Sequence, residues 1–178
     1  MKKIFAIFAF LCAAVINIQA ERVFVGAEQT KLYLPLLKGK RVALLSNHTG
    51  IVIQGTDTIH TLDLLLKHGV EVTAIFSPEH GFRGKADAGE HVNSSVDEQT
   101  GVPIWSLYDG NAKRPSDEKM KAFDVLLIDM QDVGLRFYTY YISMIRMIDA
   151  CADFGRKVIV LDRPNHNGMY VDGPILDM

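Results

Sequence analysis

The sequence predicts an α/β fold built on an open, mostly parallel sheet with helices on both faces. Four runs have the length and composition of strands, and each is nearly continuously apolar rather than alternating. Strands that are buried on both faces of a parallel sheet have this pattern. Segments with helical periodicity separate the runs, and such alternation is typical of parallel βαβ units. The four runs are residues 41–46, 72–77, 123–129 and 157–162.

A fifth apolar run, residues 102–108, predicts a weaker strand. It reads VPIWSLY and contains Pro103 near its start. Proline has no backbone N–H to give to a neighbouring strand, so it is confined to strand ends, bulges and edge strands. We therefore expect this run to form an edge strand.

Three segments between the strands have helical patterns. In residues 56–69, apolar side chains recur at helical spacing and Gly69 stands at the C-terminal end. In residues 116–123, Ser116 is a candidate N-cap followed by two acidic residues. Residues 140–155 carry isoleucines at helical spacing and end at a glycine. The apolar residues behind the first and third patterns are Ile59, Leu62, Leu65, Leu66, Ile142, Ile145 and Ile148.

The first twenty residues predict a Sec-type signal peptide. Two lysines precede an uninterrupted apolar run from Ile4 to Ile16, and Ala20 supplies a small residue at the end. A membrane-spanning helix needs about 20 apolar residues, so an uncleaved anchor is the less favoured alternative. We therefore expect a periplasmic or secreted protein, with no membrane association after cleavage and with the folded region in residues 21–178.

Charge and cysteine content argue against a nucleic-acid-binding protein and against a disulfide-stabilised one. Loss of Lys2 and Lys3 with the leader makes the formal charge of −2 more negative, and nucleic-acid binding requires a basic face. Cys12 belongs to the leader, so Cys151 is the one cysteine of the mature chain and no internal disulfide can form. Its apolar surroundings predict a small buried residue rather than a nucleophile.

Polar residues follow all four strands of the predicted sheet. In open parallel sheets, ligands bind in the crevice beyond the carboxyl ends of the strands. Turns alone require some of these residues, but not so many reactive groups at four strand ends. The sequence therefore predicts a binding or catalytic site at this edge. Its candidate residues are Asn47, Glu79, His80, Gln131, Asp132, Arg136, Tyr138, Arg163 and Asn165.

Several familiar site motifs are absent. There is no G-x-G-x-x-G, no G-x-x-x-x-G-K-[ST], no G-x-S-x-G and no H-E-x-x-H. We therefore expect no nucleotide cofactor, no serine nucleophile and no metal. Two weaker alternatives stay open: nucleotide binding at the strand ends, and a metal held by His48, His80 and His166.

The stretch FSPEHGFRG predicts a general acid. Glu79 leaves a buried strand at a corner that Pro78 stiffens and Gly81 allows to bend tightly. Partial desolvation at such a corner raises the pKa of a carboxyl group, as a general acid requires. A second carboxylate would complete a glycosidase pair, and the sequence offers three choices. These are Asp132, Asp129 and Glu90.

Aromatic side chains follow the third strand in the segment RFYTYY, residues 136–141. Rings with hydroxyl groups suit stacking against sugars. Packing against the core competes with that role, and we expect at least two of Phe137, Tyr140 and Tyr141 to be core residues.

Three blocks resemble a known family. SPEHGFRG, DMQDVGLRFYTYY and LDRPNHNGMYVDGPILD are similar to the conserved blocks of the NamZ-type exo-β-N-acetylmuramidases, and the likeness runs from about Leu36 to the end of the chain. The resemblance implies a Rossmann-like N-terminal domain of a glycoside hydrolase that releases N-acetylmuramic acid from the non-reducing end of peptidoglycan fragments. In one block, His166 stands where the family usually has proline.

The resemblance also implies roles for particular residues. Glu79 matches the proposed catalytic glutamate, and the polar residues of the other blocks match site positions. Arg136 or Arg163 is then the expected partner of the lactyl carboxylate of muramic acid, since a guanidinium pairs with a carboxylate in two-point fashion. The resemblance further implies a C-terminal domain that forms the other wall of the cleft, and we expect these 178 residues to be a fragment without it. The alternative is a truncated, inactive module that binds muropeptides without cleaving them.

Overall fold

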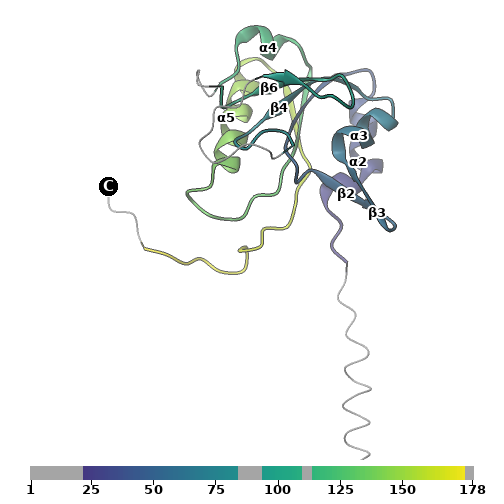
Figure 1. The fold of residues 1–178 in the computed structure, drawn as a ribbon. Helices are drawn as coiled ribbons and strands as arrows, with labels where there is room; N and C mark the ends of the chain where they lie inside the picture. The colour runs from purple at the N-terminus through teal and green to yellow at the C-terminus, as the bar shows by residue number, and fades with distance from the viewer. Residues whose placement is uncertain (1–21, 84–93, 110–113, 175–178) are drawn as a thin grey trace, which may run out of the picture.

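A six-stranded sheet in the order β5-β6-β4-β1-β7-β8 forms the centre of the computed structural model, which describes residues 22–83, 94–109 and 114–174 (Figure 1). Every neighbouring pair is parallel except β5 and β6. The predicted α/β fold with a mostly parallel sheet is confirmed. The strands are β1 (Arg41–Ser46), β4 (Glu71–Ser77), β5 (Ser95–Val96), β6 (Pro103–Ser106), β7 (Val125–Asp129) and β8 (Lys157–Val160).

Helices cover both faces of this sheet, as alternate residues of β1 show. Val42 and Leu44 pack in one apolar cluster with residues of α2 and α3, whereas Ala43 and Leu45 pack in a second cluster with residues of α4 and α5. Both faces of the strand are therefore buried, which explains its continuous apolar sequence. Besides the short 3-10 helix η1 (Gly26–Glu28), the helices are α2 (Thr30–Leu37), α3 (Thr61–Lys67), α4 (Asp117–Lys121) and α5 (Thr139–Asp153).

A hairpin precedes α3 where the sequence pattern predicted only helix. Strands β2 (Ile51–Gln54) and β3 (Asp57–His60) pair antiparallel, and α3 begins only at Thr61. The prediction of a helix from residue 56 is therefore wrong at its N-terminal end. Gly55 adopts a φ of 65° in the turn, a conformation that glycine reaches without steric cost.

The histidine at the end of this hairpin caps the helix that follows. His60 is the N-cap of α3, and its Nδ1 accepts a hydrogen bond from the Leu62 N–H at 3.1 Å. Its Nε2 lies 2.9 Å from the carbonyl oxygen of Asn47 and donates to it. Both bonds require the neutral ring with the proton on Nε2. Accordingly, burial lowers the pKa of His60, and the positive charge of Arg83 acts in the same direction.

The strand that begins at Pro103 is not at the edge of the sheet, contrary to expectation. The two residues of β5 pair with it, and Pro103 lies opposite Val96. Proline is tolerated here because it is the first residue of β6, where a missing N–H costs least. The prediction failed because a two-residue strand leaves almost no pattern in the sequence.

Helix α5 buries a different face from the one that its isoleucines indicated. Ile145 and Ile148 are 55% and 38% exposed, whereas Met147, Ala150 and Cys151 are fully buried against the sheet. Small residues on this face allow the helix to approach the strands closely. The predicted burial of Cys151 is confirmed, and this burial raises the pKa of its thiol to about 11.

The remaining helix follows its prediction. Ser116 is the N-cap of α4, and its Oγ accepts a hydrogen bond from Lys119 N–H at 3.5 Å. Within the described parts of the chain, no helix is long and apolar enough to cross a membrane. The predicted signal peptide, residues 1–20, and Glu90 lie outside the described residues.

Candidate functional site

The candidate residues gather at one edge because neighbouring parallel strands end there together. Strands β4, β1, β7 and β8 are adjacent, and in register Leu45 lies beside Phe76 while Ser46 lies beside Asp129. Ile128 in turn lies beside Val160. The segments that follow these four strands therefore start side by side along the sheet edge.

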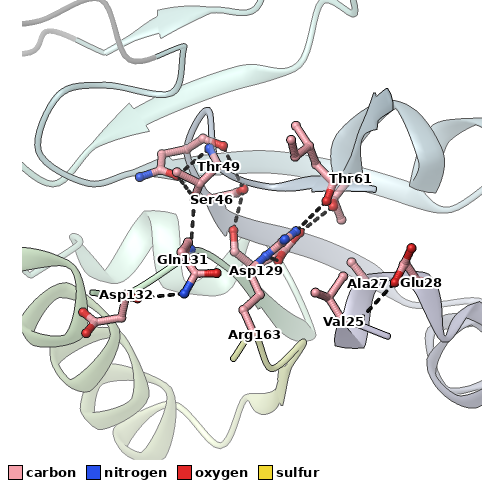
Figure 2. Close-up of polar contacts among 12 residues, drawn as sticks. Val25, Ala27, Glu28, Ser46, Thr49, Thr61, Asp129, Gln131, Asp132 and Arg163 are labelled. Atoms are coloured by element: carbon pink, nitrogen blue, oxygen red, sulfur yellow. Dashed lines mark hydrogen bonds and ion pairs between the residues drawn. The ribbon is translucent and has the colours of Figure 1, made fainter. Parts of the chain in front are cut away.

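A buried ion pair joins the ends of β7 and β8. The Asp129 side chain is completely buried, and Arg163 donates from Nε to Oδ1 at 2.6 Å and from Nη2 to Oδ2 at 3.0 Å (Figure 2). The Thr61 hydroxyl also donates to Oδ2, and Ser46 Oγ donates to the Asp129 carbonyl oxygen at 2.7 Å. We call Ser46, Thr61, Asp129 and Arg163 the Asp129 network.

Two of the sequence candidates, Asp129 and Arg163, belong to the Asp129 network. The Arg163 side chain is only 7% exposed, and its Nη2 also donates to the carbonyl oxygen of Ile51 at 2.9 Å. Both carboxylate oxygens of Asp129 already accept hydrogen bonds from protein donors. Such saturation is typical of a structural carboxylate rather than a catalytic one.

A second set of hydrogen bonds ties β1 to β7 and to the segment after β8. Asn47 Oδ1 accepts from the Thr49 N–H at 3.0 Å and from its hydroxyl at 2.6 Å. Thr49 Oγ1 accepts in turn from the Gln131 N–H at 2.9 Å (Figure 2). Gln131 Nε2 donates to the carbonyl oxygens of Asp132 and Pro164 at 2.7 and 2.8 Å. Gln131 therefore fixes the positions of three neighbouring loops.

Glu79 lies in a tight corner at the end of β4. His80 and Gly81 have φ angles of 71° and 75°, and the Gly81 N–H donates to the Pro78 carbonyl oxygen at 3.2 Å. Among the described residues, His80 is the one non-glycine residue with positive φ. This conformation costs a non-glycine residue roughly 1–2 kcal/mol, so the surrounding contacts must hold it.

The N-terminus of α5 meets this corner. The Thr139 hydroxyl donates to Glu79 Oε2 at 2.7 Å, although the two residues are 60 positions apart in the chain. Thr139 is the first residue of α5, and Tyr138 is its N-cap. We call Glu79, His80, Tyr138, Thr139 and Tyr140 the Glu79 corner.

Aromatic rings pack around the Glu79 corner. The Tyr140 ring centroid lies 4.8 Å from that of Tyr138 and 6.5 Å from that of His80, both with edge-on geometry. Burial raises the pKa of Tyr140 to about 12, and Tyr138 and the charge of Glu79 add to the rise while the Asn47 amide opposes it. The Tyr140 phenol therefore stays neutral and is able to donate a hydrogen bond at physiological pH.

The expectation that at least two rings of the aromatic segment are core residues is wrong. Tyr140 is buried at 4% exposure, but Phe137 is 80% exposed and packs in no described core. Tyr141 is half-buried, and its hydroxyl donates to the Arg136 carbonyl oxygen at 2.6 Å. Only one of the three rings is therefore a core residue.

Two buried polar atoms near this edge lack a hydrogen-bond partner within the described residues. They are Nδ2 of Asn47, a donor, and Oδ2 of Asp132, an acceptor. Asp132 Oδ1 accepts from the Gly134 N–H at 2.7 Å. A buried polar atom without a partner costs free energy, so such atoms gather where a water or a ligand completes them.

The segment after β8 brings the last candidates to the same edge and then runs away from the sheet (Figure 1). Asn167 Nδ2 donates to the Val133 carbonyl oxygen at 2.7 Å. Asn165 packs so closely on Gly134 that a Cβ there would lie 2.3 Å from its Oδ1. Arg136 is exposed, and its Nη2 donates to the Pro174 carbonyl oxygen at 2.9 Å.

Two cavities differ in their relation to these residues. One of about 130 Å³ is lined by Asp132, Tyr140 and Arg163 together with apolar residues of β7, β8 and α5. The larger one, of about 470 Å³, lies near α4 and includes none of the sequence candidates in its lining. The smaller cavity is therefore the one that the sequence candidates line.

The structure adds residues that the sequence reasoning missed. Thr139, Thr49 and Thr61 each hold a candidate side chain or its neighbour through a hydroxyl hydrogen bond. A threonine within an aromatic run was the one available signal, at Thr139. His48 and His166 are exposed, and the described ranges contain no group of three or more His, Cys, Asp or Glu residues placed to hold a metal ion.

Comparison with known proteins places this arrangement in a family. A family model described as the N-terminal part of the exo-beta-N-acetylmuramidase NamZ matches residues 42–178. The peptidoglycan beta-N-acetylmuramidase NamZ of Bacillus subtilis is 45% identical over 147 residues, which is 82% of this chain and 34% of the relative. This chain therefore spans about a third of the length of that relative.

Solved structures give the same result. Two crystal structures of DUF1343 family proteins from Bacteroides fragilis match with TM-scores of 0.73 and 0.74, at 57% and 36% identity. Each match covers 88% of this chain and 39% of the solved one. With the family model covering most of the sequence, this chain belongs to the NamZ N-terminal family.

Proposed function

We propose that this chain is the N-terminal part of an exo-acting β-N-acetylmuramidase. Its reaction is hydrolysis of the glycosidic bond of N-acetylmuramic acid at the non-reducing end of peptidoglycan fragments. One observation carries the proposal: Glu79 occupies a half-buried corner at the carboxyl end of β4, with Thr139 donating to its carboxylate. The name of the Bacillus subtilis relative supports the substrate class.

In this proposal Glu79 is the general acid. It gives a proton to the glycosidic oxygen as the bond from that oxygen to the anomeric carbon breaks. Water then supplies the hydroxyl group that the anomeric carbon gains and the proton that restores the acid. The neutral phenol of Tyr140 lines the cavity that Asp132 and Arg163 also line, and we propose that it donates a hydrogen bond to the sugar, while the His80 ring packs against it.

The exposure and hydrogen-bond partners of the remaining candidates decide the roles that we propose for them. Arg136 is exposed, whereas the Arg163 guanidinium is buried against Asp129, so we propose Arg136 as the partner of the lactyl carboxylate.

Asp132 is the proposed second carboxylate, because its Oδ2 lacks a partner within the described residues. Tyr138 is the proposed stacking surface for a sugar ring. Asn47, Gln131 and Asn165 are proposed to bind substrate directly or to hold the loops that do.

The test is the Glu79→Gln variant assayed with a chromogenic N-acetylmuramide. Turnover is expected to fall by at least two orders of magnitude, the range that removal of a general acid produces, about 10²–10⁴-fold. Asp124→Asn is the matched control, since Asp124 precedes β7 and so lies at the opposite edge of the sheet. Retained turnover in Glu79→Gln would refute the acid role.

A binding module without turnover is the second candidate. The observation that favours it is that this chain spans about a third of the Bacillus subtilis relative. Calorimetric titration of the 178-residue chain with a muropeptide, run beside the turnover assay, separates the two functions. Heat of binding with no released sugar supports the module, and turnover excludes it.

We also propose export to the periplasm or the exterior, on the basis of residues 1–20. Expression with and without this segment, followed by cell fractionation and N-terminal sequencing, tests the proposal. Retention of the uncleaved chain in the cytoplasm would contradict it.

A further inference from the structure

The carboxylate of Glu79 accepts a hydrogen bond from a hydroxyl on a different element of the fold. Thr139 Oγ1 donates to Oε2 at 2.7 Å, a normal length for a hydrogen bond from a hydroxyl to a carboxylate. Glu79 follows β4 and Thr139 begins α5, so the contact fixes a loop against a 15-residue helix. Neither the hairpin nor the Asp129 network takes part in it.

Thr139 uses its backbone and its hydroxyl for different contacts. Its carbonyl oxygen accepts from Ser143 Oγ at 3.0 Å, which secures the first turn of α5 separately. The N-cap residue, Tyr138, makes no side-chain capping hydrogen bond. The Glu79 carboxylate therefore provides negative charge at a helix start that lacks a side-chain cap of its own.

A hydrogen bond to one carboxyl oxygen restricts how the whole group can turn, so the Thr139 contact fixes the orientation of the Glu79 side chain. A hydroxyl donates more strongly to a charged carboxylate than to the neutral acid. Removal of the donor is therefore expected to make proton loss harder.

We propose that Thr139 is a positioning residue for Glu79: its hydroxyl holds Oε2, orients the carboxyl group and favours its charged form. This inference rests on the proposed function for its catalytic meaning. The hydrogen bond itself does not depend on that function.

The direct test follows the Glu79 carboxyl carbon by NMR titration in the 178-residue chain. Thr139→Val keeps the branched shape and removes the donor, so the titration midpoint of Glu79 is expected to rise by about one pH unit or more. Thr139→Ser keeps the donor and is expected to stay near the wild type. An unchanged midpoint in Thr139→Val would overturn the proposal.

Two further variants keep the test decisive. Ser143→Ala removes a hydroxyl one turn along α5 that bonds to Thr139 O and not to Glu79, so the midpoint should not move. Thr139→Ala replaces Thr139→Val if the valine variant does not fold, as judged by its amide spectrum. A midpoint that moves equally in Ser143→Ala would show a general loosening of the helix and would also overturn the proposal.

Kinetics in a turnover-competent chain separates this inference from the proposed function. Thr139→Val should lower kcat, leave KM nearly unchanged and move the alkaline limb of the pH profile upward, and Thr139→Ser should restore all three. If Glu79→Gln retains turnover, the proposed function fails while the NMR result stands. If Glu79→Gln is inactive but the Thr139→Val midpoint and pH profile are unchanged, the positioning role fails alone.

Discussion

The Asp129 network and the Glu79 corner both contain a carboxylate at the end of a strand, but the two carboxylates differ in burial. Asp129 is fully buried and receives three hydrogen bonds from Arg163 and Thr61. Glu79 is half-buried, and the Thr139 hydroxyl donates to it. Removing one partner of a fully buried ion pair leaves an uncompensated charge, whereas a half-buried carboxylate lies partly within reach of solvent.

The largest expected effect comes from breaking the Asp129 network. Asp129→Asn removes the charge that pairs with Arg163 and leaves the buried guanidinium uncompensated. The free energy of unfolding is expected to fall by about 3–5 kcal/mol, measured by urea titration. Asp124→Asn, which breaks the more exposed pair with Arg41, serves as the control and should lose far less. Equal losses in the two variants would show that burial does not distinguish these pairs.

A steric change beside the same network should have an intermediate effect. A Cβ at position 50 would lie 2.3 Å from Ser46 Oγ and 3.2 Å from the Asp129 carbonyl oxygen, so Gly50→Ala must displace one of them. A loss of about 1–3 kcal/mol is expected in the same unfolding measurement. Gly168→Ala is the control, because its nearest contact is at 3.3 Å in an exposed loop. Wild-type stability of Gly50→Ala would contradict the tight packing described here.

Stability should depend on pH through His60, which joins the hairpin to α3. Burial lowers the pKa of His60 in the folded chain, so the unfolded chain binds more protons once the pH falls below the ordinary pKa of about 6.5. Stability is therefore complete above that pH and declines below it, by no more than about 1.4 kcal/mol per pH unit for one proton.

Two variants assign this pH dependence. His60→Asn keeps a side chain that caps helices and should flatten the decline below pH of about 6.5. His68→Asn, at the exposed C-terminal end of the same helix, should retain it. A decline that persists in His60→Asn would assign the effect to another group.

The smallest effect on stability is expected at the Glu79 corner itself. In Glu79→Gln the carbonyl oxygen of glutamine still accepts from Thr139, so the free energy of unfolding should change by less than about 1 kcal/mol. Paired with the loss of turnover, this result would separate catalysis from stability at this position. A loss as large as that of Asp129→Asn would place Glu79 among the structural carboxylates.

Much of the fold could be predicted because the buried strands are nearly continuous apolar runs. Residues 41–46 match β1 to the residue, and residues 72–77 fall within β4. The β2–β3 hairpin was missed because Ile59 and Leu62 fit helical spacing across the boundary at Thr61. The β-branched residues on both sides of Gly55 are the signal that would have indicated a hairpin.

For the candidate site, the sequence indicated the sheet edge but not the contacts. The rule for ligand crevices in parallel sheets located Asn47, Glu79 and Asp132 at one edge without any tertiary information. Which side chains become neutralised there depends on long-range pairing, such as Arg163 with Asp129 across 34 residues. No local pattern encodes that choice, and the partnership of Glu79 with Thr139 is hidden for the same reason.

Helix α5 contacts both the Glu79 corner and the hydrophobic core. Its first residue holds Glu79, and its buried face at Met147 and Ala150 is fixed against the sheet. At about 1.5 Å per residue, Met147 lies roughly 12 Å along the helix from Thr139. Because a helix is stiff along its axis, we expect the packing of these core residues to influence where the Thr139 hydroxyl meets the carboxylate. Core substitutions that shift α5 by a fraction of an ångström are then expected to change the distance between Thr139 Oγ1 and Glu79 Oε2, although they contact neither residue.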